Sequence, residues 1–288
     1  MRYAVVTACQ NEEAHLPRLV TSVLSQELRP QEWVIVNDGS HDRTGEIARS
    51  LTAGTPGITV VDMPRAKSRD FASQVYAQRF GYDLLRSHSF ELIAFLDADI
   101  QLPTDYYRRV SEAFARRQSL GLAGGLLLDV GAAFHDVRKG SEQFHVPGGI
   151  QTFRRQAFDE MGGYSALAFG GQDTVADIMV AMNGWSIEVL SELRALHLRP
   201  LGASGASSWQ MGASIGRRAY SVAYRPSYLL AHCARRAPRS PMCELGKLWG
   251  YFLAALNPRE RVAVEPDVAE YFRKVQRRRL YESVRRIL

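Results

Sequence analysis

The sequence has 288 residues, of which 46% are hydrophobic and 23% are charged. This composition is ordinary for a folded protein, and the length allows one large domain or one domain with an appendage. The apolar run at the N-terminus is too short for a signal peptide, and no stretch of about 18 consecutive apolar residues occurs, so we expect neither a leader nor a membrane span.

The cysteines and the charge distribution narrow the protein class further. Cys9, Cys233 and Cys243 are odd in number and lack CxxC spacing, which argues against a disulfide framework or a structural zinc site and favours a reducing, cytoplasmic compartment. The net charge of +6 is unevenly spread: residues 1–200 carry 20 Lys and Arg against 24 Asp and Glu, whereas residues 201–288 carry 16 against 6. The last third therefore has a different electrostatic role.

In chain order, short apolar runs alternate with segments at helical spacing. We expect strands at 3–8, 33–36, 58–61 and 92–96. A helix is expected after each of the first three strands, the third over residues 68–87. Strands that alternate with helices predict an α/β fold with a mostly parallel, doubly wound sheet.

The run at 92–96 ends in Asp97-Ala98-Asp99, two carboxylates one residue apart. Ligands of open α/β sheets bind at the carboxyl ends of the strands, and oxygen ligands with room for water and phosphate are what Mg²⁺ or Mn²⁺ requires. Turn and N-cap roles are common at such positions too. The residues alone therefore leave a metal site and a plain turn open.

Asp38 follows the 33–36 run in the same way, within Asn37-Asp38-Gly39-Ser40. Its carboxylate can accept a hydrogen bond from a ribose or a base edge, although a turn with an N-cap is the simpler interpretation. The glycine pattern G-x-G-x-x-G is absent after the first strand, which argues against a nicotinamide-dependent dehydrogenase.

Further candidates lie in the second half of the chain. Gly148 and Gly149 form a small-residue segment that would let the backbone lie close to a ligand, although an ordinary loop fits the same residues. Asp173 falls at the start of a helix predicted to end near Asn183-Gly184, where a carboxylate can simply be an N-terminal cap. His197 follows a predicted strand and could be structural or a ligand.

Three segments together resemble the family 2 glycosyltransferases of the GT-A fold: VVTACQNEEAHLPRLVTSVLSQ, EWVIVNDGSHDRT and IAFLDAD. The resemblance covers roughly residues 1–200. It implies an inverting, metal-dependent enzyme that moves a sugar from a nucleotide-sugar donor, most commonly a UDP-sugar, to a hydroxyl acceptor. The inverting outcome rests on the resemblance and not on spacing.

The resemblance also implies roles for individual residues. Asp173 would be the catalytic base. Asp99 and His197 would reach Mn²⁺ or Mg²⁺ or the diphosphate. The nucleotide would be held by Thr7, Ala8, Cys9, Asp38, Arg69 and Asp97. The donor and acceptor pocket would include Gly148, Gly149 and Gln172. Two departures from the family pattern are Asn37 in place of the first Asp of DDGS and Gln172 in place of the Glu that precedes the base.

We expect a catalytic domain over residues 1–204 and a basic, mainly helical extension over residues 205–288. The extension contains arginines among aromatic residues, an apolar segment from Leu245 to Leu256 and a basic helix from about Val268 to Arg286. A lipid-facing surface, a phosphate-binding lid and a solvated basic face all fit this pattern. No recognised module supports nucleic-acid binding.

Because residues 201–288 are strongly basic, we hypothesise that the chain attaches peripherally to the cytoplasmic face of an anionic membrane. The acceptor would then be lipid-linked or a polysaccharide. Two other functions remain open at this point. A nucleotidyltransferase would share the sheet and metal site but release pyrophosphate. A non-catalytic nucleotide-sugar-binding subunit is the other, and the carboxylates at 38, 97, 99 and 173 argue against it.

Overall fold

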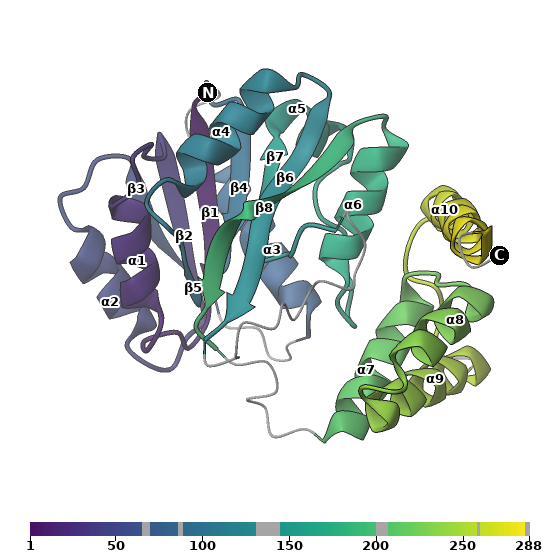
Figure 1. Ribbon diagram of the computed structural model, residues 1–288. Helices are drawn as coiled ribbons and strands as arrows, with labels where there is room; N and C mark the ends of the chain where they lie inside the picture. Colours follow the sequence, from purple (N-terminus) through teal and green to yellow (C-terminus); the bar gives the residue numbers. More distant parts are fainter. Residues whose placement is uncertain (65–69, 86–88, 131–144, 200–206, 258–259, 286–288) are drawn as a thin grey trace. The chain divides into compact units, whose positions relative to one another are not determined.

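The computed structural model describes residues 1–64, 70–85, 89–130, 145–199, 207–257 and 260–285 (Figure 1). The chain forms two compact units. One comprises Met1–Ala166 with Gln172–Leu201, and the other Leu167–Gly171 with Gly202–Leu288. The domain boundary predicted at residues 204 and 205 lies outside the described residues.

The first unit is built on one sheet. Among the described residues the sheet has eight strands: β1 (Tyr3–Cys9), β2 (Glu32–Asp38), β3 (Ile58–Met63), β4 (Leu92–Leu96), β5 (Ile100–Gln101), β6 (Leu120–Asp129), β7 (Ile150–Arg154) and β8 (Ser186–His197). Their order is β3-β2-β1-β4-β7-β6-β8-β5. The strands β1, β2, β3 and β4 run parallel to one another, and β6 is parallel to β8. The prediction of a mostly parallel sheet is confirmed.

Two strands run the other way and make the sheet mixed. The strand β7 lies between β4 and β6 and is antiparallel to both, and β5 is antiparallel to β8. Because β7 is reversed, its first residue lies at the sheet edge where β4 ends, and Ile150 pairs with Leu96. The segment that precedes β7 therefore reaches the carboxyl ends of the parallel strands.

Helices cover both faces of this sheet (Figure 1). One buried cluster joins the sheet to α1 (Leu16–Leu24), α2 (Thr44–Thr52) and α4 (Tyr106–Arg116). The other joins it to α3 (Ala72–Asp83), α5 (Arg155–Glu160) and α6 (Gln172–Met182). Side chains of β1 alternate between the two clusters, because successive residues of a strand point to opposite faces. The predicted doubly wound arrangement is confirmed.

Two predicted helix bounds can be compared with the structure. The helix α3 is shorter than the predicted 68–87, and part of that range lies outside the described residues. The helix α6 ends at Met182, and Gly184 adopts a φ of +85°, as expected for a glycine after a helix end. Asp173 lies in the first turn of α6.

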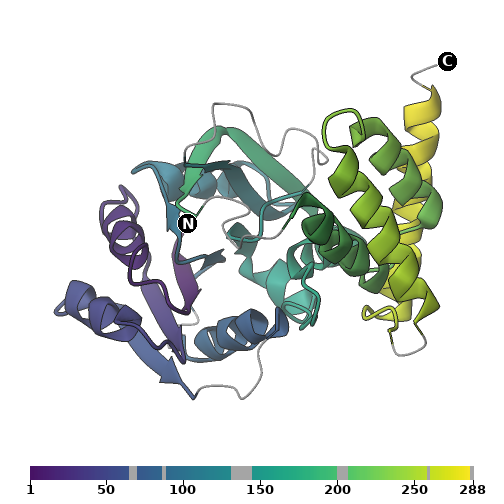
Figure 2. The same cartoon turned by 90° about the horizontal axis from the view of Figure 1, so that it is seen from below.

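The second unit is helical, as predicted for the C-terminal region. Its helices are α7 (Ser208–Ser221), α8 (Pro226–Arg236), α9 (Pro241–Leu256) and α10 (Pro266–Arg285). Figures 1 and 2 both show α7, α8 and α9 grouped side by side. Ser207 and Gln210 form a capping box that starts α7. In the part of the chain that the structure describes, no helix is long and apolar enough to cross a bilayer.

Candidate active site

The candidate residues gather at one edge of the sheet because of strand direction. The parallel strands β4, β6 and β8 end there, and each is followed or terminated by a polar side chain: Asp97 with Asp99, Asp129 and His197. His197 pairs in register with Asp129 on β6 and with Ile100 on β5. The backbone N–H of Asp97 donates to the carbonyl of Gly149, 3.0 Å away. This edge is where ligands bind in open α/β sheets.

Asp99, His197 and Asp129 form a chain of contacts. The Nε2 atom of His197 lies 3.3 Å from Oδ2 of Asp99, and its Nδ1 atom lies 2.7 Å from Oδ1 of Asp129. All three side chains are at most 15% exposed. Asp129 thus fixes the orientation of the imidazole, and Nε2 is directed to the carboxylate of Asp99.

These contacts shift the ionisation of both partners. The hydrogen bond to Asp99 raises the pKa of His197, although burial opposes the charged form, and Asp129 adds to the increase. Burial alone would raise the pKa of Asp99, but the hydrogen bond and charge of His197, together with the charge of Arg199, lower it below its usual value. Asp99 is therefore a carboxylate at neutral pH.

Asp97 lies beside Asp99 but in a different environment. Burial, and then the negative charge of Asp99, raises the pKa of Asp97 to about 7. Its Oδ1 atom accepts a hydrogen bond of 2.7 Å from Nε2 of Gln74 on α3. A Cβ atom placed on Gly149 would lie 2.8 Å from Oδ2 of Asp97, so only glycine lets the backbone pass this close.

Asp173 lies on the other side of the same glycine pair. A Cβ atom on Gly148 would lie 3.1 Å from Cβ of Asp173 and 3.3 Å from its Oδ2. The Oδ1 atom of Asp173 accepts a hydrogen bond from the backbone N–H of Thr174. The two adjacent glycines therefore pack against Asp173 and Asp97 respectively, which brings the helix carboxylate and the strand-end carboxylate to one site.

A histidine connects Asp173 to a second carboxylate of α6. The Nε2 atom of His145 lies 3.6 Å from Oδ2 of Asp173, and its Nδ1 atom lies 2.5 Å from Oδ2 of Asp177. Asp177 is 8% exposed, and burial raises its pKa to about 7 even though His145 lowers it. Gln151 is fully buried and donates to Oδ1 of Asp177, and Tyr164 donates to Gln151.

The residues expected around the nucleotide differ in how accessible their side chains are. Thr7 is fully buried, and its hydroxyl accepts a hydrogen bond from the indole N–H of Trp33. Cys9 is 2% exposed, its thiol contacts the carbonyl of Val36, and burial raises its pKa to about 12. These two can offer a ligand only their backbone atoms. Asp38 ends β2 and is 5% exposed. Arg69 lies outside the described residues.

Comparison with known proteins identifies the family. Residues 4–168, more than half of the chain, match the family described as "Glycosyl transferase family 2". The chain belongs to glycosyl transferase family 2. The family predicted from the three sequence segments is thereby confirmed.

Individual relatives of this family 2 member match over part of their length. A 4,4'-diaponeurosporenoate glycosyltransferase from Staphylococcus haemolyticus is 30% identical over 120 residues, 41% of this chain and 30% of the relative. An undecaprenyl-phosphate 4-deoxy-4-formamido-L-arabinose transferase from Aeromonas hydrophila is 31% identical over 113 residues, 38% of this chain and 32% of the relative. The chain spans about a third of the length of these curated relatives.

A solved structure shares the fold of this family 2 chain. The mannosyltransferase PcManGT from Pyrobaculum calidifontis, in complex with GDP-Man and Mn²⁺, aligns with a TM-score of 0.60 at 16% identity. The alignment covers 99% of this chain and 82% of that one. At this identity the likeness establishes the fold, which is GT-A.

The donor set of the site can be tested against the divalent cation that the family implies. Among the described residues, no group of three or more His, Cys, Asp or Glu is arranged to hold a metal ion. Asp99 and His197 form a pair of ligand types, and Mg²⁺ commonly binds through one or two carboxylates plus substrate phosphates. Asp129 supplies the outer hydrogen bond that ligating histidines normally have. The residues fit a cation whose remaining ligands are phosphate oxygens.

Glu12 adds a further buried carboxylate beside Asp99. Its side chain is 12% exposed and accepts a hydrogen bond from Arg199, and burial raises its pKa against the effect of that arginine. Its Oε2 atom has no hydrogen-bond partner within the described parts of the chain. An unsatisfied buried acceptor next to Asp99 is consistent with a site that a ligand completes.

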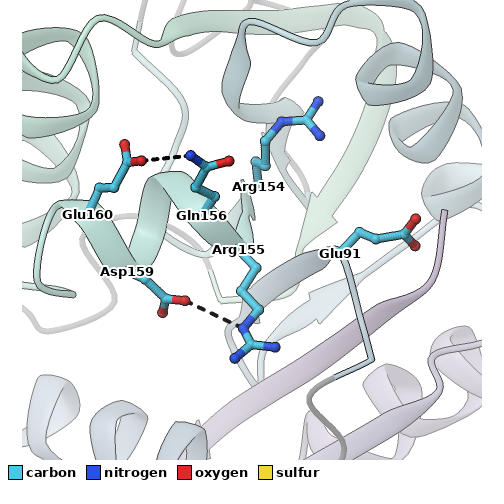
Figure 3. Close-up of a pocket in the computed structure, with 6 residues that line it drawn as sticks. All are labelled: Glu91, Arg154, Arg155, Gln156, Asp159 and Glu160. Carbon is cyan, nitrogen blue, oxygen red and sulfur yellow. Dashed lines mark hydrogen bonds and ion pairs between the residues drawn. The ribbon is translucent and has the colours of Figure 1, made fainter.

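A separate depression of about 410 Å³ lies at the opposite end of β4 (Figure 3). It is lined by Glu91, Arg154, Arg155, Gln156, Asp159 and Glu160. Arg154 uses its guanidinium to bind the carbonyls of Leu120 and Phe114, which is a structural role. Because Glu91 precedes β4 and the Asp97 pair follows it, the depression is not part of the candidate active site.

Sequence reasoning missed Asp129, His145 and Asp177. Asp129 ends the apolar run LGLAGGLLLD, just as Asp97 follows LIAFL, and that signal could have identified it. Asp177 lies four residues after Asp173, so the two carboxylates share one face of α6. His145 is 28 positions before Asp173 in the sequence, and no local pattern announces their contact.

Proposed function

We propose that this chain transfers a sugar from a nucleotide-sugar to a hydroxyl acceptor with inversion at the sugar carbon. The observation that carries the proposal is the arrangement around Gly148 and Gly149, which brings Asp173 and Asp97 to one site. Asp97 is close to the residues that fit a metal and diphosphate, and Asp173 lies at the start of α6. Family membership supports the reaction class.

A divalent cation, Mn²⁺ or Mg²⁺, held by Asp99 and His197 would stabilise negative charge on the departing diphosphate. Asp129 keeps His197 in the orientation that leaves Nε2 directed at Asp99. Backbone groups of Thr7, Ala8 and Cys9 would line the nucleotide. Asp38, Asp97 and Arg69 are proposed to complete that side, with Asp38 accepting from the ribose or base.

Asp173 is the proposed base. The acceptor oxygen forms a bond to the sugar carbon, the bond from that carbon to the diphosphate breaks, and the acceptor proton moves to Asp173. Its Oδ1 atom is already engaged by the N–H of Thr174, so Oδ2 is the atom proposed to take the proton. Such general-base catalysis typically contributes about 10²–10⁴-fold in rate. His145, held by Asp177, orients this carboxylate.

The donor is proposed to be a UDP-sugar, and a GDP-sugar is the alternative because the structural neighbour PcManGT holds GDP-Man. The acceptor is proposed to be lipid-linked or part of a polysaccharide. The name of the Aeromonas relative includes undecaprenyl-phosphate, which supports a lipid-linked substrate. The net charge of +10 over residues 201–288 supports a place at an anionic membrane surface.

The proposal is tested first by product analysis. The purified chain is incubated with UDP-, GDP- and dTDP-sugars, with Mn²⁺ or Mg²⁺, and the released nucleotide is measured. Release of free nucleoside diphosphate supports glycosyl transfer. Release of pyrophosphate from a sugar phosphate and nucleoside triphosphate would instead make it a nucleotidyltransferase. Full activity after EDTA treatment would contradict the metal assignment.

Variants then separate metal binding from chemistry. Asp99→Ala should lower affinity for nucleoside diphosphate in the presence of Mn²⁺ and abolish turnover. Asp173→Asn should retain donor binding but reduce transfer by at least about 10²-fold. Glu112→Gln on α4, which removes an exposed charge paired with Arg108, is the matched control and should change neither. Equal loss of donor affinity and rate in Asp173→Asn would make Asp173 a structural cap.

A further inference from the structure

The helix α9 has its charges and its apolar side chains in an unusual arrangement. Its charged residues, Glu244 and Lys247, are 3% and 9% exposed and form an ion pair of 2.7 Å inside the helical unit. No other residue of α9 is charged. Charged side chains are normally the exposed ones in a helix at the protein surface. The charges of α9 therefore face the interior.

The outward face of α9 is apolar along its whole length. Its large exposed side chains follow helical spacing and are 42–81% exposed: Met242, Leu245, Trp249, Phe252, Leu253 and Leu256. Positions separated by three, four and seven residues lie on one side of a helix. A continuous apolar stripe of this kind marks an interaction site and not a solvated face.

Glycines fix which face of α9 points outward. A Cβ atom on Gly246 would lie 2.5 Å from the carbonyl of Trp209, and one on Gly250 would lie 2.0 Å from the carbonyl of Ala213 on α7. Gly212 and Gly216 of α7 approach α9 equally closely. Because the two backbones are in contact along four glycines, α9 cannot rotate to bury its stripe.

The positive charge of the same C-terminal region selects the kind of partner. Arg235 and Arg239 are exposed just before α9 begins, and residues 201–288 carry a net charge of +10. A second copy of the chain would bring an equal positive charge to the contact. An anionic bilayer offers acyl chains to the stripe and negative headgroups to the arginines. Tryptophan side chains are enriched at the boundary between headgroups and acyl chains. Trp249 is on the stripe, and its ring centroid lies 6.4 Å from that of Trp209.

We propose that α9 lies flat in the interface of an anionic membrane, with its apolar stripe seated at the level of the acyl chains. This inference deepens the proposed membrane-linked acceptor and names the surface that makes the contact. It is tested without donor, metal or acceptor, so it can fail while glycosyl transfer holds, and the reverse is also true.

The experiment uses the full chain with vesicles of phosphatidylcholine alone and of phosphatidylcholine mixed with an equal part of phosphatidylglycerol. Binding is measured by co-sedimentation at low and high salt. Insertion is measured by quenching of tryptophan fluorescence with brominated lipids. We expect binding to the anionic vesicles, partial retention at high salt, and quenching that is lost in Trp249→Phe.

Paired variants test the stripe itself. Leu245→Ser with Leu253→Ser should weaken vesicle binding by at least about tenfold, since each removes apolar area from the interface. The control is Leu51→Ser with Phe80→Ser, which changes two exposed apolar residues of the first unit (41% and 37% exposed) and should bind as the wild type does.

Three results would overturn the proposal. The first is no binding to anionic vesicles at low salt. The second is binding that high salt abolishes completely and that the leucine substitutions leave unchanged, because the contact would then be electrostatic only. The third is a stable dimer by light scattering that the leucine substitutions dissociate, which would assign the stripe to a second copy of the chain.

Discussion

Replacing Asp129 by Asn should weaken metal binding while leaving the fold intact. Asp129 contacts His197 and is not itself a proposed ligand. It holds the imidazole so that Nε2 faces Asp99, and Asn keeps the size of the side chain but loses its charge. The variant therefore removes the electrostatic part of the orientation and little else.

The size of the effect follows from the geometry. The Nδ1 and Oδ1 atoms are 2.7 Å apart, and the two side chains are 15% and 11% exposed. A buried hydrogen bond to a charged group contributes about 1.5–3 kcal/mol, and a neutral one about 1 kcal/mol. The difference of about 0.5–2 kcal/mol corresponds to a loss of about 2- to 30-fold in affinity. Loss of an outer hydrogen-bond partner of a metal-ligating histidine typically costs about 10- to 100-fold, which overlaps the upper part of this range.

The assay is a titration of Mn²⁺ in the presence of UDP, with free Mn²⁺ followed by electron paramagnetic resonance. Thermal unfolding of the same samples without metal checks the fold. His197→Ala should lose more affinity than Asp129→Asn, and Glu112→Gln should match the wild type. Unchanged affinity in Asp129→Asn, alongside a clear loss in His197→Ala, would refute the orienting role of Asp129.

Three further predictions concern the helical unit. Gly250→Ala should lower the free energy of unfolding of the helical unit, measured in urea, by about 1–2 kcal/mol. The new Cβ atom would lie 2.0 Å from the carbonyl of Ala213, and this overpacking outweighs a helix-propensity gain of about 1 kcal/mol. A stabilised variant would disprove the close packing. Lys247→Met alone should destabilise by up to about 3 kcal/mol, because it leaves the buried Glu244 with only Arg236, 3.7 Å away, as a charged partner, and adding Glu244→Leu should restore most of the loss. Additive losses would contradict this. Burial and nearby positive charges lower the pKa of His232, so the unfolded chain takes up a proton at a higher pH than the folded chain does. The free energy of unfolding should therefore fall as the pH drops below about 6.5, by at most about 1.4 kcal/mol per pH unit. His232→Gln should flatten this slope in urea melts from pH 5 to 7, and an unchanged slope would exclude the effect.

The parts of the fold that depend on local patterns could be predicted from the sequence. The run Leu92–Leu96 is buried throughout and is continuous in apolar character, as a strand covered on both faces must be. The position of Asp173 in the first turn of α6 followed from its place before a periodic segment with a glycine after its end. These signals involve neighbours in the chain.

The parts that depend on pairing between distant segments could not be predicted. No local feature of β7 indicates that it inserts between β4 and β6 in the opposite direction. The contacts of His197 with Asp129 and of His145 with Asp177 join residues 68 and 32 positions apart. The apolar content of residues 245–256 was evident from the sequence. The orientation of α9 was not, because its buried Glu244 is paired with Arg236 of α8, eight positions earlier in the chain, as well as with Lys247.

The position of β6 in the sheet has a consequence for synthesis of the chain. Its two neighbours are β7 and β8, and both follow it in the sequence. The strand LGLAGGLLLD therefore leaves the ribosome before any strand that pairs with it. Residues 130–149 separate it from β7, an interval of about one to four seconds at translation rates of about 5–20 residues per second.

During that interval an apolar strand with unpaired backbone groups can pair with another nascent or misfolded chain. Nascent chains halted when β6 has left the ribosomal exit tunnel but β7 is still inside it should therefore engage chaperones or aggregate more than chains halted after β7 has also emerged. The yield of folded protein in a producing cell should accordingly depend on translation speed over this short interval, even for variants whose finished fold is equally stable.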